Sequence, residues 1–167
     1  MMIIAGFPCI GKTTIAKKYS NVVDLSSTPF HYVVSESEIT EKLKGNTKML
    51  SKNPLWPQNY IDAIKKANAT GKIVLILGRD YILEELNRLK IGYMVAVPEE
   101  GLKQEYLRRA DNRGNTKEFV QLFGEKYNEW RNMMIGQPGE KMFLKSGEYI
   151  EDALLRHGFK LTLKLTN

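Results

Sequence analysis

The stretch Gly6-Phe7-Pro8-Cys9-Ile10-Gly11-Lys12-Thr13 follows directly on the short apolar run 2–5. It matches the pattern G-x-x-x-x-G-K-[ST] at every fixed position. Residues 14–19 after it have the composition of a helix start, so the pattern stands between a buried strand and a helix, the context in which it binds phosphate. We therefore predict a strand, a phosphate-binding loop (the phosphate loop, residues 6–13) and a helix; a glycine-rich turn without a ligand is the alternative.

The residue types of the phosphate loop explain how it would hold a nucleoside triphosphate. Gly6 and Gly11 let the backbone curl until successive N–H groups point at phosphate oxygens, and the N-terminus of the following helix adds its positive dipole end. Lys12 is expected to reach the β- and γ-phosphates, and Thr13 to place its hydroxyl on Mg²⁺. The residues predicted to contact ATP are Gly6, Phe7, Pro8, Cys9, Ile10, Gly11, Lys12, Thr13 and Thr14.

Composition narrows the class of protein. The chain has 167 residues, of which 43% are hydrophobic and 26% charged, as is ordinary for a soluble globular domain. Cys9 is the single cysteine, which excludes an internal disulfide and favours a reducing compartment. No apolar run reaches the length of a membrane span, and we expect no signal peptide. These features favour a cytoplasmic protein without a membrane partner, and they identify no protein partner.

The charge of the chain indicates an anionic partner. The net charge is +6 and the pI is about 9.3. A nucleotide is an anionic partner of this kind, and so is nucleic acid. A basic surface that serves only solubility is the alternative.

Strand-like apolar runs alternate with helix-like segments along the rest of the chain. The expected later strands are 22–26, 72–77, 93–97 and 141–145, and residues 159–165 form either an edge strand or a partly ordered tail. This alternation, opened by a phosphate loop, predicts a three-layer α/β/α fold with a mainly parallel five-stranded sheet. No repeat or linker interrupts it, so residues 1–167 are predicted to form a single domain.

Polar residues follow the second expected strand, at the edge where open α/β sheets bind ligands. Asp24 ends this strand opposite the phosphate loop, and Ser26 and Ser27 continue a hydroxyl-rich edge where a second substrate would lie. Asp24 is predicted either to act as a general base toward that substrate or only to position it. Phe30 either stacks on a base or packs in the core.

The region expected on the substrate side of the phosphate loop runs from about residue 26 to residue 70. A helix capping box is predicted at 35–38, followed by a short helix to Lys44 and a basic segment, 42–52, that is either a mobile flap or a solvated loop. Two prolines then stiffen the loop 53–60. Trp56 and Asn59 in it are predicted to stack on and hydrogen-bond to a base; packing of Trp56 on the core is the alternative.

The third and fourth expected strands end in further candidates. Arg79, after the third strand, is predicted to hold a phosphate of the second substrate, and Asp80 either orients Mg²⁺ through water or caps the next helix. Beyond the fourth strand, Arg108, Arg109 and Arg113 lie beside a glycine hinge in a predicted lid, residues 108–116. Their guanidinium groups would neutralise a phosphoryl group in transfer. Surface charge without function is the alternative.

An arginine-rich lid after the fourth strand of a phosphate-loop protein resembles the nucleoside monophosphate kinase group. A closer resemblance is to small phage and prophage phosphate-loop kinases, and it covers most of the chain. The segments that carry it are Ala5-Gly6-Phe7-Pro8, Asp24-Leu25-Ser26-Ser27, Asn53-Pro54-Leu55-Trp56-Pro57-Gln58-Asn59-Tyr60-Ile61 and Arg113-Gly114-Asn115. Such proteins are similar to kinases that phosphorylate 5-hydroxymethyluracil within phage DNA. This chain departs from them at Cys9, where a glycine is usual, and at residues 78–80, where Ser- and His-type residues are usual.

The resemblance implies an ATP- and Mg²⁺-dependent kinase of the bacterial or phage-infected cytoplasm. Its acceptor would be a nucleoside monophosphate or a hydroxymethylated base in DNA, the latter in a kinase specific for the polymer. The chain lacks an Asn-Lys-x-Asp base-reading motif and an insertion large enough for a motor or transporter module, which argues against those classes. A non-catalytic ATP-binding regulator is the alternative, since it would need the phosphate loop but neither Asp24 nor the lid arginines.

Overall fold

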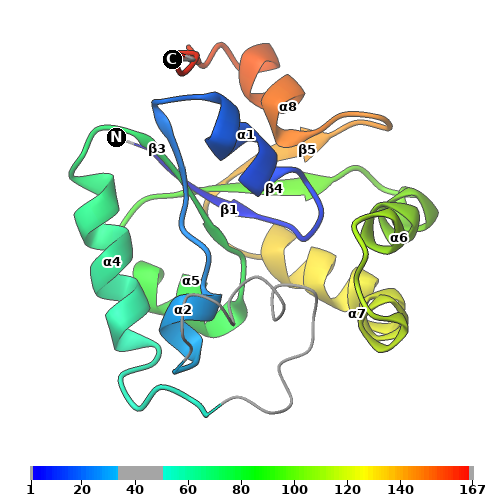
Figure 1. Ribbon diagram of the computed structural model, residues 1–167, viewed down its shortest axis with the longest axis horizontal. Helices are drawn as coiled ribbons and strands as arrows, with labels where there is room; N and C mark the ends of the chain where they lie inside the picture. Colours follow the sequence, from blue (N-terminus) through cyan, green and yellow to red (C-terminus); the bar gives the residue numbers. More distant parts are fainter. Residues whose placement is uncertain (1, 34–50, 166–167) are drawn as a thin grey trace.

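The computed structural model describes residues 2–33 and 51–165. The strands of this part of the chain are β1 (Met2–Gly6), β2 (Val22–Asp24), β3 (Ile73–Leu77), β4 (Met94–Pro98) and β5 (Glu140–Leu144). Its helices, labelled as in Figure 1, are α1 (Lys12–Lys18), α2 (Thr28–His31), α4 (Gln58–Asn68), α5 (Asp80–Arg88), α6 (Lys103–Asn112), α7 (Lys117–Ile135) and α8 (Ile150–Arg156). The capping box and helix predicted between residues 35 and 44, and most of the basic segment 42–52, lie outside the described residues.

The five strands form one parallel sheet in the order β2-β3-β1-β4-β5. From β1 the chain runs outward to β2 at one edge, and β3 then fills the position between them. The chain next crosses to the other side of β1, where β4 and then β5 are added. The phosphate loop therefore leaves the middle of the sheet, at the carboxyl edge where parallel sheets bind ligands. The predicted fold class is confirmed.

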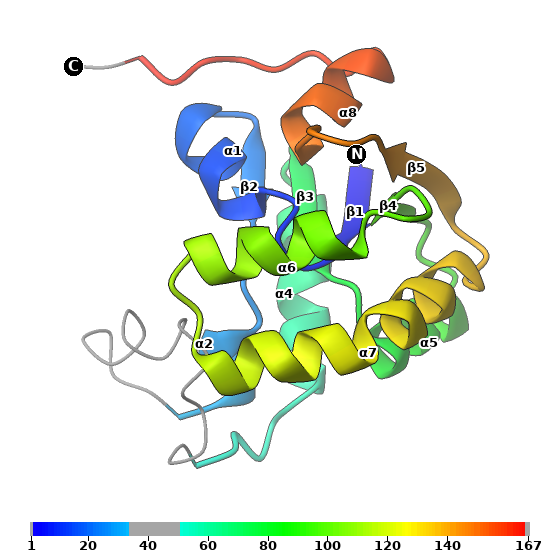
Figure 2. The same ribbon diagram turned by 90° about the vertical axis from the view of Figure 1, so that its right-hand side faces the viewer.

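Helices cover both faces of this sheet. In Figure 1, α1 and α8 lie on one side of the strands, and α4, α5 and α7 lie on the other. This division follows from right-handed crossovers: the connection from β1 to β2 runs in the opposite direction along the sheet to the later ones. Figure 2 shows α6 between the two helix layers, across the carboxyl edge of the strands.

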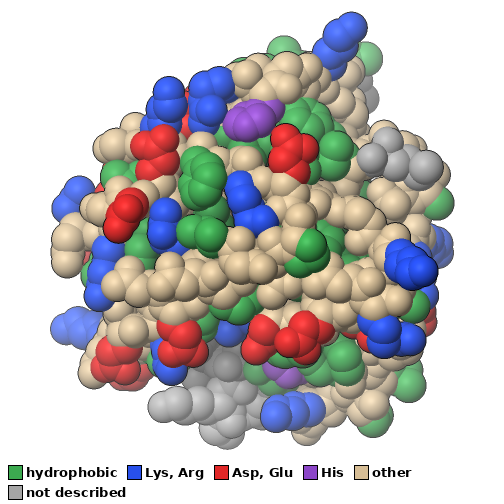
Figure 3. Space-filling view, turned by 180° about the vertical axis from the view of Figure 1, so that it is seen from behind, with side chains coloured by type: hydrophobic (Ala, Val, Ile, Leu, Met, Phe, Trp, Pro, Cys, Tyr) green, Lys and Arg blue, Asp and Glu red, His purple; other side chains and the backbone are tan. Residues whose placement is uncertain are grey.

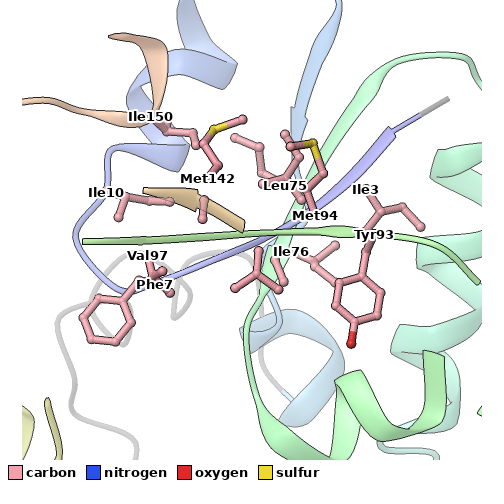
Figure 4. Close-up of a cluster of buried hydrophobic side chains, with 14 of the residues drawn as sticks. Ile3, Phe7, Ile10, Leu75, Ile76, Tyr93, Met94, Val97, Met142 and Ile150 are labelled. Carbon is pink, nitrogen blue, oxygen red and sulfur yellow. The ribbon is translucent and has the colours of Figure 1, made fainter. Parts of the chain in front are cut away.

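The phosphate loop is anchored in the core by an aromatic side chain. Phe7 is fully buried, and its ring centre lies 5.1 Å from that of Tyr127, 5.8 Å from that of Phe123 and 5.9 Å from that of Tyr106. Figure 4 shows Phe7 below Val97, with the apolar side chains of the sheet beside it. Burial of a Phe side chain contributes about 1.5–3 kcal/mol. The loop is thereby held against α6 and α7.

The C-terminal segment packs on α1 without becoming a regular strand of the sheet. The prediction left open an edge strand or a tail for residues 159–165. The structure shows one isolated antiparallel bridge, between Tyr19 and Leu163. The amide of Lys164 donates to Lys18 O at 3.0 Å, and its ammonium donates to Ala16 O at 2.9 Å. The segment therefore satisfies carbonyl groups at the end of α1.

Tyr60 ties the ends of β2 and β3 together, and it supports a prediction on stability. Its hydroxyl donates to Leu25 O at 2.7 Å and accepts from Leu77 N at 3.1 Å, within the core. Tyr60→Phe is expected to lower the free energy of unfolding by about 1–3 kcal/mol, because it leaves two backbone groups without a partner. Urea denaturation followed by circular dichroism measures the change.

Tyr106 is the matched control for this variant. Its ring is also fully buried, but within the described residues its hydroxyl has no hydrogen-bond partner. Tyr106→Phe should therefore change the free energy of unfolding by less than about 0.5 kcal/mol. Equal losses in the two variants would mean that the hydrogen bonds of Tyr60 are not the cause.

Candidate functional site

The backbone of the phosphate loop adopts the curled conformation that its glycines predict. Gly11 has φ 92°, which favours glycine, and a Cβ there would also lie only 3.0 Å from the ring of Tyr149 and crowd it. Cys9 has φ 62°, a left-handed conformation that a residue with a side chain adopts only at a cost. A glycine at this position would avoid that cost. α1 begins directly after Gly11, at Lys12.

Lys12 lies in the centre of the curl. Its ammonium group donates to Gly6 O at 3.3 Å and to Phe7 O at 3.1 Å. Burial lowers the pKa of Lys12, and the negative charge of Asp24 opposes that shift. The side chain therefore places a cation within the ring of backbone groups where the motif predicts the phosphates of ATP.

Thr13 and Asp24 meet at the mouth of the loop. The hydroxyl of Thr13, in the first turn of α1, donates to Asp24 Oδ2 at 2.7 Å. Asp24 is the last residue of β2, which α1 connects to the phosphate loop, so both side chains reach the carboxyl edge of the sheet. A hydroxyl and a carboxylate at this separation supply the oxygen ligands that Mg²⁺ prefers. The same carboxylate is placed to accept a proton.

The three arginines of the predicted lid do not all lie on the same face of α6. Arg109 and Arg113 are four residues apart and share one face of the end of α6, whereas Arg108 is exposed on the opposite side from buried Tyr106. Arg113 lies close enough to Cys9 and Lys12 for its positive charge to lower the pKa of both. Burial is the larger effect on Cys9 and raises its pKa. The charge of Arg109 also lowers the pKa of Cys9, so both of these arginines lie near the phosphate loop.

Arg109 is held in the interior rather than in a free lid. Its side chain is only 9% exposed, and its guanidinium carbon lies 4.6 Å from the ring centre of Tyr106 and 4.1 Å from that of Tyr149. It donates to Glu105 and, at 2.8 Å, to Glu148 O. Its Nη1 is buried and has no hydrogen-bond partner among the described side chains and backbone. Arg109 therefore joins α6 to the segment before α8.

Glu105 is a site residue that sequence reasoning missed. Its carboxylate accepts from Ser146 Oγ at 2.9 Å and from Gly147 N at 3.0 Å, as well as from Arg109. The segment 145–149 is thereby fixed beside the loop, and Ile150 N donates to Ile10 O at 2.8 Å. The i, i+4 spacing of Glu105 and Arg109 could have indicated this pair, but the partners after β5 lie too far along the sequence to predict.

The substrate side carries an aromatic cluster. Trp56 stacks on His31 with ring centres 4.4 Å apart, and on Tyr60 at 5.5 Å. Phe30 packs on Tyr60 at 5.4 Å. Asn59 donates to Phe30 O at 2.8 Å and accepts from Tyr60 N, so its amide holds this loop in place. Packing is the role that the structure gives these residues, and contact with a base stays a prediction.

The remaining candidates line the same edge of the sheet. Ser26 and Ser27 are half-buried after β2, and Ser27 O accepts from Phe30 N and His31 N at the start of α2. Arg79 follows β3, and its guanidinium carbon lies 4.7 Å from the ring centre of Trp130. Asp80 is exposed in the first turn of α5 and accepts from the adjacent Tyr81 N at 2.8 Å, whereas the N-cap position of this helix is Arg79, so the structure does not show Asp80 as the cap. A metal role for Asp80 stays a prediction.

Comparison with known proteins supports the fold. The fold is similar to that of the Deinococcus radiodurans tunicamycin resistance protein. The two structures align over 98% of each chain with a TM-score of 0.52 and 14% sequence identity. At this identity the likeness concerns the fold alone. No protein-family model and no curated protein sequence matches this chain.

The oxygen ligands that the protein offers beside the phosphate loop suit a metal ion that is also bound by the phosphates of a nucleotide. Across residues 2–33 and 51–165, no three His, Cys, Asp or Glu side chains form a cluster that could bind a metal ion by themselves. Thr13 and Asp24 are the oxygen donors beside the loop. Mg²⁺ ordinarily takes one or two protein ligands together with phosphate oxygens of a nucleotide. The site therefore suits Mg²⁺ that arrives with a triphosphate.

The distribution of charged side chains on the surface and the apolar character of the helices relate to the predictions on nucleic acid and membrane. On the face drawn in Figure 3, Lys and Arg side chains are interspersed with Asp and Glu side chains. Within the part of the chain that the structure describes, none of the helices combines the length and the apolar character needed to cross a membrane. Contact with nucleic acid stays a prediction from the net charge of +6.

Proposed function

We propose that this protein is a phosphotransferase that moves the γ-phosphate of ATP to a nucleotide-type acceptor. The observation that carries the proposal is the hydrogen bond of 2.7 Å between Thr13 and Asp24, beside the ammonium group of Lys12. It joins a phosphate-binding loop to a carboxylate from a different strand. A protein that only binds ATP needs the loop and a ligand for Mg²⁺, but it does not need a general base.

The donor half of the proposed site rests on the phosphate loop. Backbone N–H groups of the phosphate loop would hold the phosphates, except at Pro8, which has none, and at Phe7, whose amide donates to Ala96 O at 2.9 Å. Lys12 would contribute the positive charge. Thr13 would bind Mg²⁺, which neutralises charge on the phosphates when it is present. Arg113 is close to both Lys12 and Cys9, which supports its role as the cation that closes on the transferring group.

The acceptor half favours a hydroxyl group. A monophosphate already carries an anionic oxygen and needs only positive charge around it. A hydroxyl must lose its proton as the bond to phosphorus forms, and a carboxylate within hydrogen-bond reach accepts it. Asp24 is held at that position by Thr13. We therefore propose a hydroxyl on a nucleoside, a nucleotide or a modified base in DNA as the acceptor.

A transfer screen with γ-labelled ATP tests the proposal. The acceptors are deoxynucleosides, nucleoside monophosphates, DNA containing 5-hydroxymethyluracil, and tunicamycin because of the protein of similar fold. We expect label on at least one hydroxyl-bearing acceptor, and loss of transfer when EDTA removes Mg²⁺. Label on DNA alone would identify a polymer-specific kinase. Binding of ATP with no transfer to any of them would contradict the proposal and favour a non-catalytic nucleotide-binding protein.

A further inference from the structure

Arg79 and Trp130 form a stacked pair beside the phosphate loop. Arg79 follows β3 and Trp130 belongs to α7, 51 positions later in the numbering, and the guanidinium carbon lies 4.7 Å from the ring centre. Both side chains are half-buried. The aromatic spacing of α7 predicts packing for Trp130, and its ring does lie 5.9 Å from that of Phe123. The contact with Arg79 is additional to that packing.

The pair borders a small hollow that the phosphate loop also lines. The rest of its wall consists of Gly6 and Pro8 of the loop, Leu77 and Gly78 at the end of β3, and Met134 of α7. A Cβ at Gly78 would overlap the side chain of buried Met134, so α7 lies directly against this end of β3. Phe123, which packs on Trp130, also packs on Phe7 of the loop. Trp130 is therefore fixed relative to the loop from two sides.

We propose that Trp130 is a positioning residue that holds the guanidinium group of Arg79 beside the phosphate loop, where Arg79 binds a phosphate group of the acceptor. The proposal rests on the phosphotransferase function above and narrows its substrate class to acceptors that carry a phosphate. Stacking on an indole face uses the flat surface of the guanidinium group and leaves its N–H edge available for bidentate hydrogen bonds to phosphate. It also removes side-chain freedom that binding would otherwise have to restrict.

Acceptor kinetics test the role of each side chain. Arg79→Ala is expected to raise the acceptor KM by about tenfold or more, through loss of a charged hydrogen bond, and to leave the KM for ATP unchanged. Trp130→Leu should raise the acceptor KM by about two- to thirtyfold, the range of a cation–π contact, and Trp130→Phe should restore much of it. An equal rise in the KM for ATP would overturn the proposal, because Trp130 would then support the whole site.

The double variant separates positioning from general packing. If Trp130 acts through Arg79, Arg79→Ala/Trp130→Leu should have the same acceptor KM as Arg79→Ala alone. Additive losses would mean that Trp130 acts independently of Arg79, which would overturn its positioning role. Thermal unfolding of each variant identifies any that fails to fold, and Trp130→Phe then carries the comparison because it keeps an aromatic ring at that position.

A binding experiment that needs no turnover distinguishes this proposal from the proposed function. The chain has two tryptophans, so 5-fluorotryptophan labelling yields two ¹⁹F signals, and Trp130→Phe assigns one of them. With a non-hydrolysable ATP analogue in the phosphate loop, deoxynucleoside monophosphates and a single-stranded oligonucleotide are compared with the matching deoxynucleosides. We expect a phosphate-bearing probe, and no phosphate-free one, to shift the Trp130 signal, and Arg79→Ala to remove the shift.

The outcomes of the two experiments are separable. A shift with the monophosphates alone identifies a free nucleotide as the source of the phosphate, and a shift with the oligonucleotide identifies a polymer. Equal shifts with phosphate-free probes, or a shift that persists in Arg79→Ala, would overturn the inference even if phosphate transfer is observed. An Arg79-dependent shift without transfer to any acceptor would leave the phosphate site in place and contradict the proposed reaction.

Discussion

Lys12→Ala is expected to lower the rate of phosphate transfer by about 10²–10³-fold, the usual effect of removing one preorganised donor from a reacting group. The ammonium group of Lys12 already lies inside the loop, in contact with Gly6 O and Phe7 O. No other lysine occurs in the loop, so no second ammonium group of the loop replaces its charge. A steady-state assay at saturating acceptor measures the change in kcat.

Binding of ATP should fall in the same variant. A ligand present at about 100 times its Kd stabilises a protein by about 2.7 kcal/mol, so ATP should raise the unfolding temperature of the wild type and raise that of Lys12→Ala much less. Lys17→Ala is the matched control, because Lys17 is an exposed lysine in the last turn of the same helix. If Lys12→Ala keeps full transfer, or if Lys17→Ala loses as much, the phosphate loop is not the donor site.

Asp24→Asn is expected to lower kcat by about 10²–10⁴-fold with a hydroxyl acceptor, the range that a general base contributes. The amide oxygen of asparagine can still accept the hydrogen bond from Thr13, so the variant changes the charge and basicity and leaves the shape of the site intact. With a phosphate oxygen as the acceptor there is no proton to remove, so the general-base role predicts a small loss, whereas a carboxylate that acts only as a ligand of Mg²⁺ predicts the same loss with both acceptors. The ratio of kcat values for the two kinds of acceptor is the measurement.

Asp80→Asn is the control for this variant. Asp80 is also an aspartate at the carboxyl edge of the sheet, but it contacts Tyr81 N in α5, and the hydroxyl of Thr13 is bonded to Asp24 instead. We expect transfer by Asp80→Asn to remain within about twofold of the wild type, as for a surface substitution. A large loss in Asp80→Asn and a small one in Asp24→Asn would assign the essential carboxylate to Asp80, and the general-base role of Asp24 would be wrong.

Local patterns predicted the elements and the edge of the sheet where the candidates gather. The predicted strand 72–77 appears as β3, Ile73–Leu77. The positions of the arginines in the sequence also predict that they occupy different faces of the helix, because residues four apart share a helix face and adjacent residues do not. A shared role of Arg108, Arg109 and Arg113 in a lid stays a prediction.

Contacts between distant parts of the chain could not be predicted in the same way. Glu105 binds Ser146 and Gly147, and Arg79 stacks on Trp130. Each of these contacts depends on which helix crosses which strand end. A composition or a period within one segment carries no information on that choice, so Trp130 is indistinguishable from the core aromatics of α7 in the sequence.

The phosphate loop is the feature that the sequence determined by itself. Its geometry depends on residues that are adjacent in the chain: glycines that permit the curl, a strand before it and a helix after it. What lies opposite the loop was decided only by the tertiary structure. Asp24 reaches Thr13 because β2 ends at the same edge as the loop, and Arg79 reaches the loop because β3 pairs with β1. Strand order results from packing over the whole chain, and it alone brings these side chains together.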